Sequence, residues 1–197
     1  MPDFAASIRL RRVASPPASN DGLGPSVVRK KLRADAEVVI RAIRPDDEPL
    51  MVKFRGMLSD RTVYFRYFCS LSLTTRTAHE RLAHICFVDS EREAVLVADH
   101  TDPKTGEQSI VAVGRLNKLP DGKSAEIAVL VSDLYQSQGI GKKLLLRLIE
   151  IAREQKIARL IAEMLRDNIP MQAVLKRLGF RLSLLNDPRS VRAVLEL

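Results

Sequence analysis

The stretch AEIAVLVSDLYQSQGIGKKL, residues 125–144, joins a strand pattern to a helix pattern through a loop that contains two glycines. Its first seven residues are apolar except for Glu126, which is typical of a buried strand. From Gly139 to about Gln155, apolar residues recur at the spacing of one helix face. The glycines let backbone N–H groups approach an anion, and the helix that follows brings its positive end to the same point. We therefore expect this loop to bind a phosphorylated group, with a pyrophosphate as its natural ligand.

The loop differs from two well-known phosphate-binding motifs. The dinucleotide fingerprint requires a third glycine, and that position holds Leu144. A P-loop requires Gly-Lys followed by Ser or Thr, which the spacing here does not provide. Lys142 and Lys143 add positive charge beside the glycines and favour an anion site. The alternative is an ordinary turn between a strand and a helix that contains glycine.

Strand and helix patterns extend outward from this stretch in both directions. Upstream, we expect strands at 38–43, 94–98 and 109–116 and helices at 46–58, 60–68 and 75–85. Downstream, we expect a strand inside 156–165, a helix that begins near Pro170 and ends before Gly179, and closing strands at 180–184 and 191–195. This order predicts a mixed α/β (α+β) fold around one sheet.

Residues 1–36 differ in composition from the rest of the chain. They contain ASPPASNDG at 14–22, which is too polar and too rich in turn-forming residues to bury an apolar core. They also hold seven basic and three acidic residues, so half of the net charge of +8 lies there. We expect a basic, flexible leader at 1–36 and one folded domain at 37–197.

The composition argues against several classes of protein. The chain has 197 residues, 28% of them charged, and no apolar run near the roughly 18 residues that a membrane span needs. Two cysteines are too few for a disulfide scaffold, and three histidines argue against an ordinary zinc site. With aromatic residues at 5% and no tryptophan, the chain offers little to stack on nucleic-acid bases. We expect a cytoplasmic protein without a metal, and with neither a membrane nor a nucleic acid as its partner.

Two motifs connect the chain to a known superfamily. The loop Gln136-Ser137-Gln138-Gly139-Ile140-Gly141 resembles the acyl-CoA-binding signature Gln/Arg-x-x-Gly-x-Gly/Ala of the GNAT N-acetyltransferases. A second signature, Asn168 followed by Leu178-Gly179-Phe180 after one helix, lies at the matching distance. The resemblance covers residues 38–197. It implies the GNAT fold, a mixed and mostly antiparallel sheet of six to seven strands flanked by helices, and acetyl-CoA as co-substrate.

Further motifs resemble one branch of that superfamily, the bacterial protein-lysine acetyltransferases of the Pat type that modify acyl-CoA synthetases. These motifs are Arg41 with Pro45-Asp46-Asp47, VYFRYF at 63–68, and AEIAVLV at 125–131. The branch implies a protein substrate with a target lysine, and we expect a monomer or a weak homodimer. The region expected to line the acceptor groove is rich in arginine, which favours an acidic protein surface as the partner; these residues are Arg61, Arg66, Arg76, Arg81 and Arg92.

The resemblance also implies binding roles, position by position. Backbone groups of Leu130 and Val131 would hold the pantetheine arm and the acetyl carbonyl where the strand splays from its neighbour. Asn168 would bind the cofactor arm near the sulfur. The pyrophosphate would be held by the loop residues Gln136, Ser137, Gln138, Gly139, Ile140, Gly141 and Lys142. From the residues alone, Leu130 and Val131 also fit a packed core, and Asn168 also fits a helix N-cap ahead of Pro170.

Glu126 is the candidate catalytic residue. It is an acid inside an apolar strand, and by alternation it shares a face with Ala128 and Leu130. Loss of hydration favours the protonated form of a carboxylate, so such a residue suits a general base that takes a proton from a lysine ammonium near neutral pH. The related lysine acetyltransferases use a glutamate on this strand. The alternatives are an acid on the solvated face of an edge strand and a structural partner of an arginine.

One position departs from many relatives, which carry a tyrosine as general acid in the last helix where this chain has Leu175. The lysine-modifying branch manages without that tyrosine. We therefore expect an N-acetyltransferase that acts on a protein lysine by direct attack in a ternary complex. Two alternatives stay open, which are an N-acetyltransferase of small amines and a non-catalytic module that senses acyl-CoA.

Overall fold

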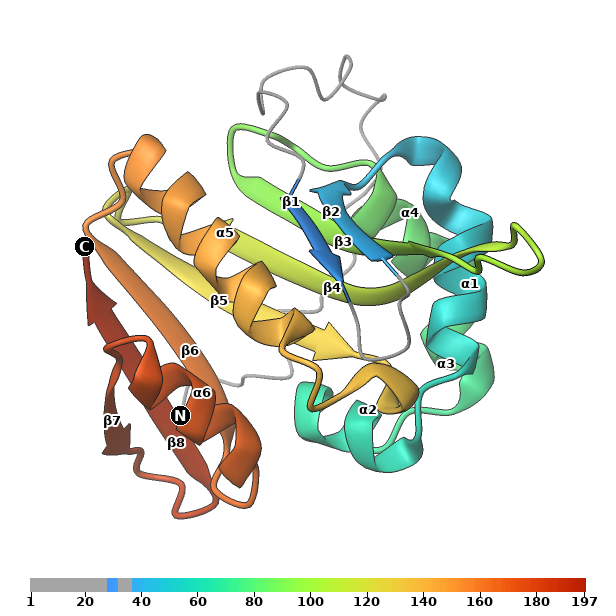
Figure 1. Ribbon diagram of the computed structural model, residues 1–197. Helices are drawn as coiled ribbons and strands as arrows, with labels where there is room; N and C mark the ends of the chain where they lie inside the picture. Colours follow the sequence, from blue (N-terminus) through green and yellow to red (C-terminus); the bar gives the residue numbers. More distant parts are fainter. Residues whose placement is uncertain (1–27, 32–36) are drawn as a thin grey trace.

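The computed structural model describes residues 28–31 and 37–197. The strands of this part of the chain are β1 (Val28–Lys31), β2 (Glu37–Ala42), β3 (Glu93–Thr101), β4 (Gln108–Lys118), β5 (Ser124–Val131), β6 (Arg159–Leu165), β7 (Arg181–Leu184) and β8 (Ser190–Glu196). They form one sheet in the order β1-β2-β3-β4-β5-β6-β8-β7 (Figure 1). Neighbouring strands are antiparallel except β5 and β6, which are parallel. The mixed, mostly antiparallel sheet that the resemblance implies is confirmed.

Helices pack on both faces of this sheet. They are α1 (Glu48–Gly56), α2 (Asp60–Tyr67), α3 (Leu73–Thr77), α4 (His79–Cys86), α5 (Ile140–Glu154) and α6 (Ile169–Arg177), with short 3-10 helices η2 (Pro45–Asp47) and η3 (Asp133–Tyr135). Leu144, Leu145 and Leu148 of α5 are buried in the core on one face, and Figure 1 shows α5 lying across the strands. Phe54 of α1 and Leu82 of α4 are buried in a second core on the other face.

Strand β5 presents alternate residues to these two cores. Ala125 and Ile127 belong to the core beneath α5, and Val129 and Val131 pack against it. Leu130 belongs to the other core, the one that α1, α2 and α4 line. Because side chains alternate along a strand, Glu126 lies on the same face as Leu130. The predicted shared face of Glu126 and Leu130 is confirmed.

Strands β5 and β6 part soon after they begin. Their parallel pairing joins residues 124–126 to residues 159–161. Beyond that point β5 pairs with β4 as far as Val131, whereas β6 pairs with β8 as far as Leu165. Figure 1 shows the two strands diverging toward the lower part of the view. The expected splay beside Leu130 and Val131 is therefore present, and Glu126 is the residue at which it starts.

A buried ion-pair network anchors the first helices to the sheet. Arg41 on β2 donates to both carboxylate oxygens of Asp47, at 2.7 and 2.8 Å, and to Asp99 on β3 at 2.9 Å. Asp47 also accepts from the backbone N–H of Arg44 at 2.7 Å. Burial acts to lower the pKa of Arg41, but the carboxylates of Asp47 and Asp99 together outweigh it and raise that pKa. Arg41 and Asp47, which belong to the motif behind the closer resemblance, therefore have a structural role.

The observed elements follow the predicted ones with three differences. The helix expected at 75–85 is two helices, α3 and α4, separated by an extended Ala78. Strands β3 and β4 are longer than predicted, and a bulge lies between them where Ala98 pairs with Ala112 but Asp99 pairs with Ile110. Strand β1 lies inside the expected leader and adds an eighth strand to the six or seven predicted. The rest of that leader, residues 1–27 and 32–36, lies outside the described residues.

Candidate functional site

The loop ahead of α5 has the backbone geometry of an anion site. Gly139 takes a left-handed conformation, with φ of 77°, at the N-cap position of α5. Ser137 is also left-handed, with φ of 58°. The N–H groups of the first helical turn have no acceptor inside the helix, and they carry the positive end of its dipole. Lys142 and Lys143 are exposed in that turn, so the charge and the donors suit a phosphate group.

The second glycine of the motif lies directly against β5. A Cβ atom on Gly141 would be 3.5 Å from Val131 Cγ2 and 3.7 Å from Val129 Cγ1, both ordinary contact distances. Ile140 is buried in the core, so its side chain anchors the start of α5 and only its backbone faces the loop. The loop is thus held at the end of β5, at the open end of the gap that starts where β5 and β6 separate at Glu126.

The two glutamine side chains of the motif bind the protein itself. Gln136 Nε2 donates to the carbonyl oxygen of Val131 at 3.1 Å and to Thr62 Oγ1 at 3.1 Å. Gln138 Nε2 donates to the carbonyl oxygen of Leu134 at 3.2 Å. These bonds fix the loop's shape, and a ligand in the loop would meet mainly backbone N–H groups.

The other predicted cofactor residues lie on β5 and just beyond the end of β6. Leu130 pairs with Val113 of β4 and is buried, and Val131 pairs with Ala112. Within the described chain, no strand pairs with the β6-facing edge of β5 beyond Glu126, so that edge is open to an extended ligand. Asn168 follows the end of β6. Its Oδ1 accepts from the N–H of Met171 at 3.3 Å, which confirms the predicted N-cap and leaves the ligand role as a prediction.

Glu126 occupies a half-buried position between these strands. It pairs with Asn117 on β4 and, as the last pair with β6, with Ile161. Helix α2 contacts both β5 and β6 on the same side of the sheet. Arg66 of α2 lies close enough for its charge to interact with that of Glu126. Burial lowers the pKa of Arg66, and the charges of Tyr67 and Glu126 oppose this only in part.

Two more arginines surround this pair, and the sequence did not reveal their arrangement. Arg115, on β4 opposite Ala128, forms an ion pair with Glu93 at 2.6 Å. Arg55 of α1 donates to the Tyr67 hydroxyl and lies over its ring, 5.5 Å from the centroid. The position of Arg66 in the motif VYFRYF pointed to the acceptor groove in general, but nothing in the local pattern placed it beside Glu126.

The arginines expected on the acceptor surface separate into different environments. Arg61 and Arg92 are exposed and Arg66 is half-buried, whereas the side chain of Arg81 is not among those described. Arg76 is buried, donates to the carbonyl oxygen of Leu58 at 3.1 Å and pairs with Asp60 at 3.5 Å. The expectation was therefore wrong for Arg76, because its guanidinium supports the chain ahead of α2 instead of facing a partner.

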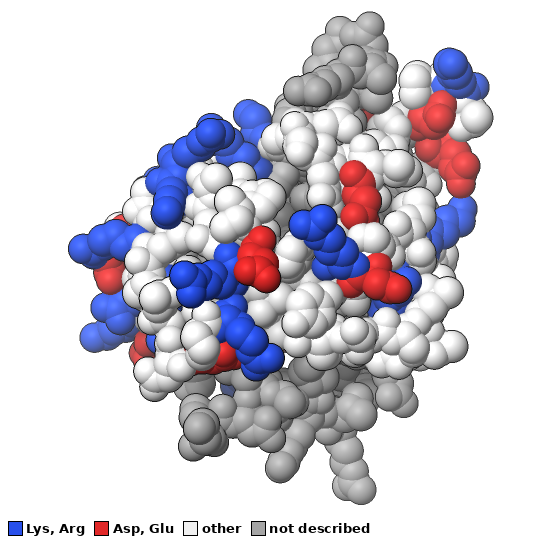
Figure 2. Space-filling model, turned by 90° about the horizontal axis from the view of Figure 1, so that it is seen from below, with Lys and Arg blue, Asp and Glu red and all other residues white. Residues whose placement is uncertain are grey.

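Basic side chains gather on one part of the face that Figure 2 shows. Figure 2 looks from below, the side on which Figure 1 places α2 and α6, and Lys and Arg gather in its left part. Lys176, Arg177 and Arg181 are the exposed basic residues of α6 and β7. Acidic side chains are interspersed with basic ones toward the middle and right. Such an excess favours an anionic ligand or an acidic partner.

Leu175 lies on the buried side of α6, in the core beneath the sheet. The place of the tyrosine that many relatives carry therefore offers no proton donor. Within the described residues, no group of three or more His, Cys, Asp and Glu side chains is arranged to hold a metal ion. None of the helices described is both long enough and apolar enough to span a membrane.

Comparison with known proteins agrees with this geometry. Residues 37–181 match the family model of the acetyltransferase (GNAT) domain. An acetyltransferase of Pseudomonas aeruginosa is 27% identical over 73% of this chain and 74% of its own length. The acetyltransferase Pat of Mycolicibacterium smegmatis is 29% identical over 71% of this chain, which spans 40% of that relative's length.

Solved structures show the same architecture. The GNAT domain of S. lividans PAT superposes with a TM-score of 0.75 at 26% identity, covering 87% of this chain and 97% of that domain. The PaiA N-acetyltransferase of Thermoplasma acidophilum, solved in complex with coenzyme A, shares the fold at 16% identity with a TM-score of 0.63, covering 81% of this chain and 99% of its own. The matched family model covers β2 to the start of β7 and includes both the loop and Glu126. The chain belongs to the GNAT family of acetyltransferases.

Proposed function

We propose that this acetyltransferase moves the acetyl group of acetyl-CoA to a lysine side chain of a protein, with Glu126 as general base. The resemblance to the Pat branch favours an acyl-CoA synthetase as the acceptor. The observation that carries the proposal is the place of Glu126, half-buried and at the residue where β5 and β6 part. A carboxylate there lies next to the gap between β5 and β6. In the proposal, the acyl group reaches this gap from one side and the amine reaches it from the other.

The residues of the splay suit acetyl-CoA in three parts. The loop 136–142 and the first turn of α5 would hold the pyrophosphate through N–H groups and the charge of Lys142. The open edge of β5 at Leu130 and Val131 would hold the pantetheine arm, and Asn168 at the end of β6 would contact it near the sulfur. When bound, acetyl-CoA supplies the thioester whose carbonyl carbon accepts the amine.

The proposed reaction moves protons from the lysine ammonium and to the leaving thiolate. Glu126 takes a proton from the lysine ammonium, directly or through one water, and the neutral amine bonds to the thioester carbon. The carbon–sulfur bond breaks, so CoA leaves as a thiolate, and the nitrogen loses its second proton to water as the amide forms. Leu175 cannot protonate that thiolate, which therefore leaves as the anion and takes its proton from solvent. The chain forms no covalent bond to the acetyl group in this scheme.

The charges around Glu126 bear on the choice of acceptor. The charge of Arg66 interacts with that of Glu126 and with those of Arg55 and Arg115, and Glu93 is already paired with Arg115. A small polycation such as a polyamine would meet net positive charge there. A lysine on an acidic protein surface would place its single ammonium at Glu126. The acidic residues that surround this lysine on the partner would then lie near the arginines. This distribution favours a protein acceptor over a polyamine.

Protein acetylation in a cell lysate tests the proposal. The lysate would receive acetyl-CoA with wild-type protein, Glu126→Gln or the matched control Glu150→Gln, which changes an exposed acid on the outer side of α5. We expect mass spectrometry to find acetylated lysines with wild type and Glu150→Gln, an acyl-CoA synthetase among them, and not with Glu126→Gln. Absence of protein acetylation by a wild-type protein that still binds acetyl-CoA would contradict the protein-lysine assignment and favour small amines or a sensor.

A further inference from the structure

A carboxylate at the start of the cofactor loop is bonded to the N-terminus of α2. Asp133, in η3, accepts from the backbone N–H of Ser59 at 2.9 Å and from its hydroxyl at 2.7 Å. It also accepts from the hydroxyl of Thr62 at 2.8 Å. Ser59 is the N-cap of α2 and Thr62 lies in its first turn. Three hydrogen bonds therefore join segments that are more than 70 positions apart in the sequence.

The donors and acceptors of this contact form one consistent network. The Ser59 hydroxyl donates to Asp133 and accepts from the N–H of Thr62 at 3.2 Å. The Thr62 hydroxyl donates to Asp133 and accepts from Gln136 Nε2 at 3.1 Å. Gln136 in turn donates to the carbonyl oxygen of Val131, at the end of β5. Each hydroxyl donates once and accepts once, so the network runs unbroken from β5 through the loop to α2.

The charge on Asp133 strengthens this link. Partial burial acts to raise the pKa of Asp133, but the hydrogen bonds from Ser59 and Thr62 outweigh it and leave the pKa below its ordinary value. The group is therefore an anion at neutral pH, next to the positive end of α2. Hydrogen bonds to an ionised carboxylate are stronger than hydrogen bonds between neutral groups, so three of them hold the two segments together firmly.

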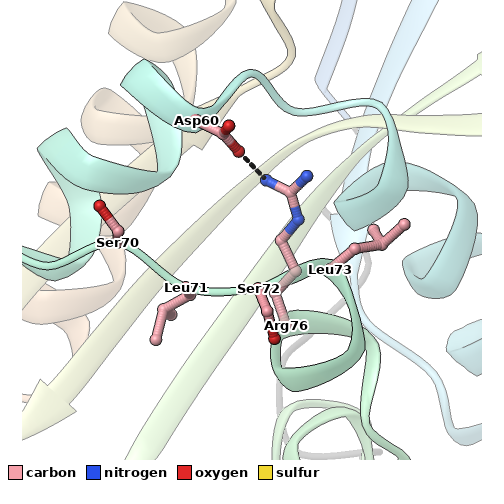
Figure 3. Close-up of a pocket in the computed structure, with 6 residues that line it drawn as sticks. All are labelled: Asp60, Ser70, Leu71, Ser72, Leu73 and Arg76. Atoms are coloured by element: carbon pink, nitrogen blue, oxygen red, sulfur yellow. Dashed lines mark ion pairs between the residues drawn. The ribbon is translucent and has the colours of Figure 1, made fainter.

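Helix α2 carries the link onward to the catalytic side of the sheet. It contacts β5 and β6, and its Arg66 lies close enough to Glu126 for the two charges to interact. Figure 3 shows the residues that line a pocket beside the start of α2, which are Asp60, Ser70, Leu71, Ser72, Leu73 and Arg76. The pocket has a volume of about 470 Å³. Arg76 reaches from α3 to Asp60 and to the carbonyl oxygen of Leu58. The start of α2 is thus held by Arg76 of α3 and by Asp133 ahead of the loop.

We propose that Asp133 is a positioning residue that couples occupancy of the cofactor loop to the placement of α2, and through α2 to Arg66 beside Glu126. The inference rests on the proposed function, because it takes the loop 136–142 as the acetyl-CoA site. A ligand that orders this loop also restricts Gln136 and Asp133, and their bonds pass that restriction to Ser59 and Thr62. Coupling of this kind is reciprocal, so an ordered α2 also favours the bound loop.

Hydrogen exchange of the full chain, measured by mass spectrometry with and without acetyl-CoA, tests this coupling. In wild type we expect acetyl-CoA to slow exchange in the loop 136–142 and to slow it about fivefold or more in α2, the lower end of ordinary coupling. In Asp133→Ala the loop remains protected by acetyl-CoA, and the ligand-dependent protection of α2 disappears. Thr62→Val removes the shared hydroxyl and keeps the two bonds from Ser59 to Asp133, so it should reduce the ligand-dependent protection of α2, and it serves if Asp133→Ala does not fold.

The matched control is Asp121→Ala. Asp121 accepts from the N–H groups of Lys123 and Ser124 in the turn before β5, at the end of that strand away from the loop. The variant Asp121→Ala should show the same acetyl-CoA-dependent protection of the loop 136–142 and of α2 as wild type. Two results would overturn the coupling and leave the proposed function standing. In the first, acetyl-CoA protects the loop of the wild-type protein without any effect on α2. In the second, the protection of α2 survives intact in Asp133→Ala and Thr62→Val. No protection of the loop by acetyl-CoA would overturn both.

Discussion

Glu126 and Ile161 form the last pair between the only parallel strands among the described residues. Before this pair the sheet is continuous, and after it β5 and β6 diverge around an edge of β5 that no described strand occupies. The carboxylate is therefore placed by backbone pairing on one side and by α2 on the other. A base at the closed end of a splay has a fixed position relative to anything bound in it, which acid–base catalysis requires.

Gly139 should tolerate a side chain poorly. Its φ of 77° is left-handed, so Gly139→Ala should lower the free energy of unfolding by about 1–2 kcal/mol and disturb the first turn of α5. Gly141→Ala should cost less stability, because its φ is not left-handed and its Cβ would meet Val129 and Val131 at ordinary distances. Urea unfolding of the two variants makes the comparison. A larger loss in Gly141→Ala would contradict the geometry of the loop.

The network of Arg41 should be important for folding and not for chemistry. Arg41 and Asp47 are both almost fully buried, so Arg41→Ala would leave Asp47 and Asp99 without their cation. Breaking such a pair costs about 3–5 kcal/mol in the free energy of unfolding. Thermal or urea unfolding would measure the loss, and the acetyl-CoA affinity of the folded fraction should be unchanged. A variant as stable as wild type would refute the anchoring role.

The two cysteines should differ in reactivity. Cys69 is exposed, whereas Cys86 is buried and its burial raises the pKa of the thiol to about 12. Because the thiolate is the reactive form, an alkylating reagent at pH 8 should modify Cys69 in the native protein and Cys86 only after denaturation. Peptide mapping by mass spectrometry distinguishes the two. Rapid native labelling of Cys86 would show that α4 opens readily.

Local sequence patterns predicted some parts of this site and missed others. The strand ending at Val131, the helix that begins after Gly139 and the cap at Asn168 each depend on a few neighbouring residues, so local patterns were enough to predict them. The break at Ala78 depends on tertiary contacts. Arg76 and Leu82 are both buried, yet residues six apart on one helix point about 120° apart, so a continuous helix would not place both on one narrow face.

The contacts of Asp133 and Arg66 show the same limit more strongly. Asp133 bonds to Ser59 and Thr62 across more than 70 positions, and Arg66 meets Glu126 across the packing of α2 on β5. No periodicity within either segment predicts these contacts between distant parts of the chain. The family resemblance predicted the splay and the acid on β5, whereas the groups that hold α2 over them became visible only in the folded chain.

The most direct test of the central claim compares chemistry and binding in Glu126→Gln. With a protein acceptor found in the lysate experiment, we predict that kcat falls by about 10²–10⁴, the usual contribution of a general base. The dissociation constant of acetyl-CoA, measured by calorimetry, should stay within about threefold of wild type, because the loop and the open edge of β5 are untouched. A variant that keeps wild-type turnover, or that loses acetyl-CoA binding together with turnover, would contradict the assignment of Glu126 as the base.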